Sequence, residues 1–177
     1  MDRCIIYIMG VSGSGKSTIG KKLAKKISLP FFDGDDYHPA ANREKMKSGI
    51  PLTDEDRGGW LIRINELAKK QMIKEGAVIA CSGLKEKYRR ILSAGVTIPF
   101  FWIFLQGSFD LIQKRMEERR GHFMPPKLLS SQFDSLETPK ECVTIDISKN
   151  PEVIVETIIF EITKKLKTQS KTSKNAK

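Results

Sequence analysis

Continuous apolar runs and stretches of spaced apolar residues follow one another regularly along this chain. Five short continuous runs have the length and the β-branched content of strands that are buried on both faces. Between them, apolar residues recur every three or four positions, which indicates amphipathic helices. Strand and helix signals that alternate in this way predict an α/β fold with a parallel sheet. The predicted strands are 3–9, 29–32, 77–81, 100–105 and 142–146.

The helical pattern also indicates where individual helices begin and end. The capping sequence Thr53-Asp-Glu-Asp56 opens the longest helix, and Gly76 closes it. A chain of 177 residues suits one compact domain, which we place at 1–167. The predicted helices are 15–27, 42–48, 53–75, 85–93, 109–119 and 151–166, with one more short helix within 120–139.

A glycine-rich sequence follows the first strand and opens the first helix, which is the context of a phosphate-binding loop. Its glycines permit backbone angles that turn successive N–H groups toward phosphate oxygens, and the helix N-terminus adds positive potential. We expect Lys16 to reach the β- and γ-phosphates of ATP and the Ser17 hydroxyl to bind Mg2+. The alternative is a chance Gly-Lys-Ser in a turn, and the flanking strand and helix count against it. The predicted ATP-binding residues are Gly10, Val11, Ser12, Gly13, Ser14, Gly15, Lys16, Ser17 and Thr18.

Carboxylates gather where the second strand ends, in the sequence Asp33-Gly-Asp-Asp36. Ligands of open α/β sheets bind beyond the carboxyl ends of the strands, and an acid there can accept the proton of an attacking hydroxyl or orient hydrated Mg2+. We favour Asp35 as the base and Asp33 for the metal, although the sequence leaves open which of the two is the base. A solvated acidic turn is the alternative. We add His38 to the substrate site, although a histidine before proline is more often a hydrogen-bonding turn residue than a base.

Three cations near the second and third strands are candidates for binding an anionic substrate: Arg57, Lys85 and Arg89. Lys85 and Arg89 are four positions apart, so on a helix they would share a face. The planar guanidinium of arginine matches a carboxylate with two hydrogen bonds, which suits a small acidic substrate. The alternative for each residue is a surface charge, and for Arg90 we prefer that interpretation.

A second basic group precedes the polar, proline-containing segment 120–139. We assign Arg115 to ATP binding, and Arg119 and Arg120 to neutralising the charge on the transferring phosphoryl group. The segment itself is predicted to be a mobile helical lid that orders when substrate and nucleotide are both bound. The alternatives are a fixed helical hairpin packed on the sheet edge and, for the arginines, a solvated helix face.

The net charge of +10 comes mostly from the C-terminus, because residues 164–177 contain six lysines and no acid. We predict a disordered Lys-rich tail at 168–177, and favour a solvated terminus over one that binds nucleic acid. No apolar run approaches the roughly 20 residues that span a bilayer, and no signal-peptide pattern opens the chain. Cys4, Cys81 and Cys142 lack metal-ligand spacing. We therefore expect a cytoplasmic protein whose cysteines are reduced core residues.

Longer motifs surround these candidates: Asp33-Gly-Asp-Asp-Tyr-His-Pro39, Asn42 through Arg57, Trp60-Leu61, Cys81-Ser-Gly-Leu-Lys85, Tyr88-Arg89, Arg119-Arg-Gly-His-Phe-Met124, Gln132-Phe133 and Leu136-Glu-Thr-Pro139. From Met9 to about residue 160 the chain resembles the gluconokinase family of P-loop kinases, with mild departures at Gly83 and Gly58-Gly59. The resemblance implies a shikimate-kinase-like α/β/α fold in three layers, with a five-stranded parallel sheet of order 2-3-1-4-5 and a helical lid. It also implies phosphorylation of D-gluconate by ATP and Mg2+, which gives 6-phospho-D-gluconate.

Other classes of function account for less of the sequence. A regulatory GTPase requires an Asn-Lys-x-Asp loop, which this chain lacks. A shikimate kinase is the nearest enzymatic alternative, because it too binds a hydroxy acid beside a P-loop, but the motifs from Asp33 to Arg57 favour gluconate. A nucleotide-dependent nucleic-acid binder would rest on the tail alone. No membrane partner is expected, and the sequence leaves a homodimer open.

Overall fold

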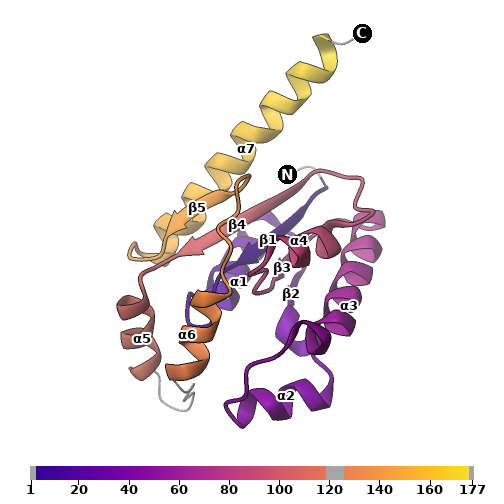
Figure 1. Ribbon diagram of the computed structural model, residues 1–177. Coiled ribbons are helices and arrows are strands. Elements are labelled where there is room, and N and C mark those ends of the chain that lie inside the picture. The colour runs from indigo at the N-terminus through magenta and orange to yellow at the C-terminus, as the bar shows by residue number, and fades with distance from the viewer. Residues whose placement is uncertain (1–2, 119–125, 176–177) are drawn as a thin grey trace.

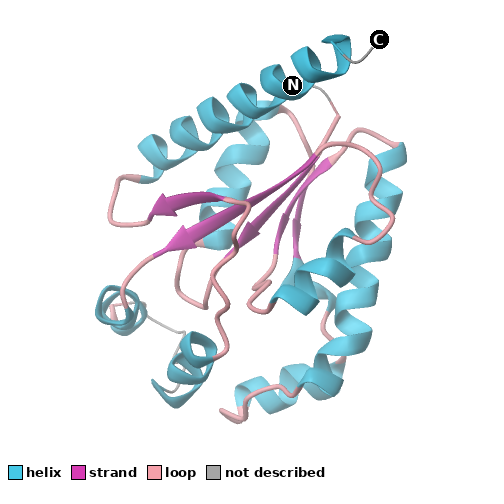
Figure 2. Cartoon of the chain, turned by 45° about the horizontal axis from the view of Figure 1, so that its top comes forward, coloured by secondary structure: helices cyan, strands magenta, loops and turns pink. Residues whose placement is uncertain are grey.

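Five parallel strands form the central sheet of the computed structural model, which describes residues 3–118 and 126–175 (Figure 1). Neighbouring strands are all parallel, and their order is β2-β3-β1-β4-β5. The predicted α/β class and the strand order implied by the family resemblance are therefore confirmed (Figure 2). The strands are β1 (Ile5–Met9), β2 (Phe31–Asp33), β3 (Ala77–Ala80), β4 (Phe100–Gln106) and β5 (Val143–Asp146).

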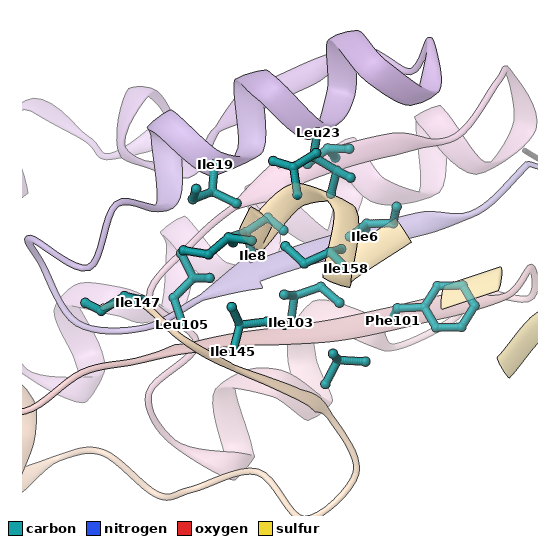
Figure 3. Packing of buried hydrophobic residues seen from close by; sticks show 14 of the residues in the cluster. Ile6, Ile8, Ile19, Leu23, Phe101, Ile103, Leu105, Ile145, Ile147 and Ile158 are labelled. Carbon is teal, nitrogen blue, oxygen red and sulfur yellow. The ribbon is translucent and has the colours of Figure 1, made fainter. Parts of the chain in front are cut away.

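Helices cover both faces of the sheet, because alternate residues of each strand point to opposite sides. Helices α1 (Lys16–Ile27) and α7 (Pro151–Asn175) pack on one face, and α3 (Asp54–Ile73) and α4 (Glu86–Ser93) pack on the other. Figure 3 shows Ile19 and Leu23 of α1 against Ile6 and Ile8 of β1. The intervening residue Tyr7 faces the opposite core, with Trp60 of α3. The result is the predicted three-layer arrangement.

The remaining helices lie around the carboxyl ends of the strands (Figure 1). They are the 3-10 helix η1 (Gly34–Tyr37) and the helices α2 (Ala40–Lys47), α5 (Phe109–Glu117) and α6 (Pro126–Asp134). The acidic segment after β2, for which a solvated turn was the alternative interpretation, forms a short 3-10 helix that Asp33 caps by accepting the backbone N–H of Asp35 at 3.2 Å. The carboxyl edge of the sheet is thus surrounded by short helices, which gather the candidate residues.

The C-terminal helix is longer than the sequence pattern predicts. Helix α7 continues to Asn175, so its expected end near Leu166 is wrong, whereas the disordered Lys-rich tail at 168–177 stays a prediction. Loss of apolar periodicity removes packing but does not by itself stop a helix. No glycine or proline follows Pro151 within α7, and its lysines and glutamine favour helix.

Cysteine burial agrees with the sequence interpretation at two of the three positions. Cys4 and Cys81 are buried in the core, and both are free thiols. Cys142 is also free but only half-buried, because it precedes β5 and does not belong to it. Among the described residues, no helix has the length and apolar content needed to cross a membrane.

Candidate active site

The donor loop, residues 10–17, connects β1 to α1 at the carboxyl edge of the sheet. Gly15 caps α1 with φ of 92°, a conformation that glycine adopts without strain, and no heavy atom lies within 4 Å of where its Cβ would be. Gly13, with φ of 80°, leaves no room for a side chain, because a Cβ would lie 2.8 Å from Met116 Cγ. The open backbone and the N-terminus of α1 together fit a phosphate group.

One buried polar atom in the donor loop also fits an absent phosphate. The Ser14 hydroxyl is buried and has no hydrogen-bond partner among the residues that the structure describes. Buried polar groups are normally hydrogen-bonded, so a group without a partner at this position agrees with a loop built to hold a ligand. Thr18, also predicted to bind ATP, lies exposed in the first turn of α1.

The structure brings together the two residues that were assigned to the metal. The Ser17 hydroxyl donates a hydrogen bond to Asp33 Oδ2 at 2.5 Å. Mg2+ in phosphoryl-transfer sites takes one or two protein oxygens and completes its shell with water and phosphate oxygens. Residues 3–118 and 126–175 contain no cluster of three or more acidic, histidine or cysteine side chains for a metal. A Ser–Asp pair beside a phosphate loop therefore fits Mg2+ and not a metal held by protein alone.

The Asp35 carboxyl interacts electrostatically with Lys16 of the donor loop and with Arg57 of α3. Asp35 is exposed at the surface, but nearby protein removes part of the hydration of its carboxyl, and this desolvation raises its pKa. Lys16 lowers the pKa, Asp33 raises it and Arg57 lowers it. A carboxylate with a raised pKa between two cations is suited to accept a proton from a hydroxyl group.

The acceptor pocket is a cavity of about 310 Å³ at the N-termini of α3 and α4. The Arg57 guanidinium lies 5.8 Å from the Tyr88 ring centroid, and burial lowers its pKa. In the described part of the chain, no carboxylate lies within 4.0 Å of its guanidinium. Arg57 is thus placed to bind an anionic substrate. The pocket is lined by Leu52, Thr53, Asp54, Glu55, Arg57, Leu84, Lys85, Tyr88, Ser131 and Ser135.

Asp54 organises the cations of the acceptor pocket. Its carboxylate accepts hydrogen bonds from Lys85 Nζ at 2.9 Å, from Lys87 Nζ and from the Tyr88 hydroxyl. These donors hold the pKa of Asp54 well below its usual range, with Lys87 contributing most. Lys85 therefore lies in the predicted site, but its charge is already paired. Asp54 links the start of α3 to the start of α4.

Arg89, predicted to bind the same substrate as Lys85, lies elsewhere. Its Nη1 donates hydrogen bonds to the carbonyls of Gly83 and Leu84 at 2.8 and 3.1 Å, and its side chain is buried. It lines a separate groove of about 1110 Å³ together with Trp102. The expected shared helix face is wrong, because Lys85 is the N-cap of α4 and has extended backbone angles.

Two other basic residues behave differently from Arg57. Arg90 is exposed and pairs with Glu86 at 2.6 Å, as expected of a surface charge. Arg115 donates to the carbonyl of Ile147 at 2.6 Å, on a helix that also packs against Gly13 of the donor loop. This position is compatible with the predicted nucleotide contact.

His38 is a buried residue that packs against Trp60 of α3. It is 4% exposed, and its ring stacks on Trp60 with centroids 4.3 Å apart. Burial lowers its pKa to about 4, and the charges of Arg57 and Arg43 add to this effect. The imidazole is therefore neutral near pH 7. Asn42 lies 3.4 Å from its Nδ1, so the ring is held within the protein and does not line the acceptor pocket.

Only part of the predicted lid can be placed. Arg119, Arg120 and the first part of the segment, 120–125, lie outside the described residues. The remainder contains α6, whose Leu129 is buried in the core. Phe133 of the same helix packs on Phe109, with ring centroids 5.4 Å apart. This described part is therefore anchored to the core, as the fixed-hairpin alternative expects, and a mobile lid stays a prediction.

Sequence reasoning did not identify several residues that build the site. Asp54 was interpreted only as an acid in a helix's first turn, although its partners lie more than thirty positions away. Ser131 of α6 and Ser135 just after it line the acceptor pocket, and the Gln132 side chain contacts the donor loop. The family motifs contain Asp54, Tyr88 and Gln132, so they point to these positions without giving their contacts.

Comparisons with known proteins agree with this geometry. The shikimate kinase family profile matches residues 12–163. A probable gluconokinase of Xenopus tropicalis is 42% identical over 92% of this chain and 95% of its own length. The thermosensitive gluconokinase of Escherichia coli strain K12 is 48% identical over 84% of this chain and 82% of its own length. The crystal structure of a gluconokinase from Sinorhizobium meliloti 1021 superposes with a TM-score of 0.85 and 39% identity, and covers 94% of this chain and 97% of that one.

Proposed function

Because this chain belongs to the shikimate kinase family, and within it to the gluconokinases, we propose that it phosphorylates D-gluconate with ATP to give 6-phospho-D-gluconate and ADP. The observation that carries the proposal is the electrostatic interaction of the Asp35 carboxyl with both Lys16 of the donor loop and Arg57 of the acceptor pocket. A phosphoryl donor and a carboxylate-bearing acceptor would meet at this carboxylate. We also propose that the reaction takes place in the cytoplasm.

The donor side holds the triphosphate and neutralises its charge. Backbone N–H groups at the N-terminus of α1 bind phosphate oxygens, and Lys16 supplies a positive charge at the transferring group. Ser17 and Asp33 are the residues that would hold Mg2+, which supplies charge neutralisation across the β- and γ-phosphates when bound. Arg115, Arg119 and Arg120 are proposed to add positive charge around the nucleotide.

The acceptor side orients the sugar acid. Arg57 binds the gluconate carboxylate, and Lys85 adds positive charge while Asp54 fixes its position. Asp35 accepts the proton of the C6 hydroxyl as that oxygen forms its bond to the γ-phosphorus. The bond between that phosphorus and the β–γ bridging oxygen breaks, and ADP leaves. His38 stacks on Trp60 and stays neutral, so its role is structural and it takes no proton in the reaction.

A substrate panel tests the proposal directly. Release of ADP is measured with gluconate, shikimate, other sugar acids and nucleoside monophosphates as acceptors. We expect kcat/KM to be highest for gluconate, because the acceptor pocket presents an unpaired arginine together with polar groups for hydroxyls. Preference for shikimate would instead favour the nearest related kinase activity. Turnover only with nucleoside monophosphates, or with none of these acceptors, would contradict the proposed function.

A further inference from the structure

Helix α6 reaches the donor loop through a single side chain. Oε1 of Gln132 accepts a hydrogen bond from the backbone N–H of Ser12 at 2.7 Å. Ser12 is the third residue of the loop, and the two residues are 120 positions apart in the sequence. A side-chain amide from a distant helix is therefore part of the loop's hydrogen bonding.

The other end of the same peptide group is held from within the loop. Lys16 Nζ donates a hydrogen bond to the carbonyl of Val11 at 3.0 Å. The Val11 carbonyl and the Ser12 N–H belong to one planar trans peptide, so they point to opposite sides of the chain. Gln132 and Lys16 thus hold one peptide group from its two sides. Rotation of that group would break both hydrogen bonds.

The helix that carries Gln132 is firmly supported. Leu129 is 1% exposed and packs in the core with Ile112 of α5, and Phe133 packs on Phe109. Ser131 of the same helix lines the acceptor pocket, and so does Ser135 directly after the helix end. Helix α6 therefore contacts both the donor loop and the acceptor pocket, and its position decides where the Gln132 amide lies.

We propose that Gln132 is a positioning residue for phosphoryl transfer, which fixes the Val11–Ser12 peptide so that the Val11 carbonyl holds the Lys16 ammonium at the phosphate site. The inference rests on the proposed function and extends its machinery to a residue outside the donor loop. A charge aimed at the transferring group is most valuable in the transition state, so a displaced Lys16 affects kcat as well as nucleotide binding. The acceptor pocket, which Gln132 does not line, is unaffected.

Two substitutions of Gln132 separate hydrogen bonding from packing. Gln132→Leu fills similar space without an acceptor, and Gln132→Asn keeps the amide but is one methylene too short. We expect each to lower kcat and to weaken binding of a non-hydrolysable ATP analogue by about 5- to 10-fold, the scale of one lost hydrogen bond. The KM for gluconate stays within about twofold. Gln113→Leu on α5 is the matched control: it loses a bond to Glu117 and leaves all three quantities unchanged.

Hydrogen exchange at one amide gives a readout that a purely structural role would not move. In 15N-labelled protein, the Ser12 amide should exchange faster in Gln132→Leu and Gln132→Asn, and remain slow in Gln132→Glu, whose carboxylate still accepts the bond. If the leucine variant does not fold, the asparagine variant carries the test. Folded variants with unchanged analogue affinity, kcat and Ser12 exchange overturn the proposal. Exchange and analogue binding require no gluconate, so they test Gln132 even if the substrate panel contradicts the proposed function.

Discussion

The donor loop and the acceptor pocket are built by different means. The donor loop is one continuous stretch whose shape depends on glycines with positive φ and on the start of α1. The acceptor pocket is assembled from side chains of α3, α4 and α6, and ion pairs around Asp54 hold it together. Local backbone chemistry thus makes the first, and tertiary packing makes the second. Damage to the donor loop should therefore act on the chemical step, whereas damage to the acceptor pocket should act on substrate affinity.

The largest effect is expected from Lys16→Ala, which removes the charge of the donor loop. Lys16 is half-buried at the start of α1 and contributes to no core cluster, so the variant should fold normally. We expect kcat to fall by about 1000-fold, as when a group that stabilises transition-state charge is lost. Steady-state kinetics and a thermal melt measure the two effects. Lys25→Ala, an exposed lysine of the same helix, is the control and should retain full activity. Wild-type turnover in Lys16→Ala would contradict the assignment of the phosphate site.

The second-largest effect is expected from substitution of the carboxylates after β2, Asp33 and Asp35. Asp35→Asn should lower kcat by roughly 100- to 10,000-fold, because asparagine accepts no proton. Asp33→Asn should instead raise the Mg2+ concentration that gives half-maximal activity. Kinetics with varied Mg2+ compare the two variants. If Asp33→Asn shows the loss of kcat at saturating Mg2+ and Asp35→Asn does not, the two roles are exchanged.

The same carboxylate predicts a pH dependence. Desolvation raises the pKa of Asp35, and the ionised form is the active base. Activity should therefore fall as the pH drops through this raised pKa, at a higher pH than for an ordinary aspartate. Arg57 lowers the pKa of Asp35, so its removal should move the acid limb of kcat/KM to higher pH.

Arg57→Ala tests the acceptor pocket and separates it from Arg89. We expect the KM for gluconate to rise about 10- to 100-fold, with ATP binding little changed, because a charged hydrogen bond to the carboxylate is lost. Arg89→Ala should change that KM less than about threefold. It should instead lower the free energy of unfolding by about 1–3 kcal/mol, because the carbonyls of Gly83 and Leu84 lose their donor. Equal KM values for Arg57→Ala and the wild type would place the substrate anion elsewhere.

How far the sequence predicts this molecule depends on how local each feature is. The donor loop is contiguous, so its motif and flanks predict its position. The pairing of Ser17 with Asp33 depends instead on the tertiary structure, because β3 lies between β1 and β2 in the sheet. Arg89 was misplaced because a four-residue spacing brings side chains together only inside a helix, and Lys85 is the cap before it. Asp54 correctly indicated the start of a helix. The three residues that donate hydrogen bonds to its carboxylate, however, lie in α4 and at its N-cap, far away in the sequence.

At the C-terminal end of α7, the sequence pattern predicts a helix that is too short. The polar composition after Leu166 predicts a segment outside the core, but composition alone does not set the backbone conformation. Helix continues while no residue interrupts its hydrogen bonding. Packing and backbone conformation therefore have to be predicted separately.

The smallest predicted effect is the contribution of His38 to the pH dependence of the free energy of unfolding. The unfolded chain binds a proton on His38 near pH 6.5, whereas the folded protein holds its pKa at about 4, mainly through burial. The unfolded state therefore binds more protons between these values, and the free energy of unfolding should decrease by roughly 1–2 kcal/mol from pH 6.5 to pH 5. His38→Phe keeps an aromatic ring on Trp60 without the titration, so urea unfolding of this variant should depend less on pH by that amount. The other histidine, His122, is present in both proteins and cancels in the difference. The same pH dependence in wild type and variant would mean that His38 takes up its proton in the folded protein, and that Arg57 has a charged neighbour beneath it.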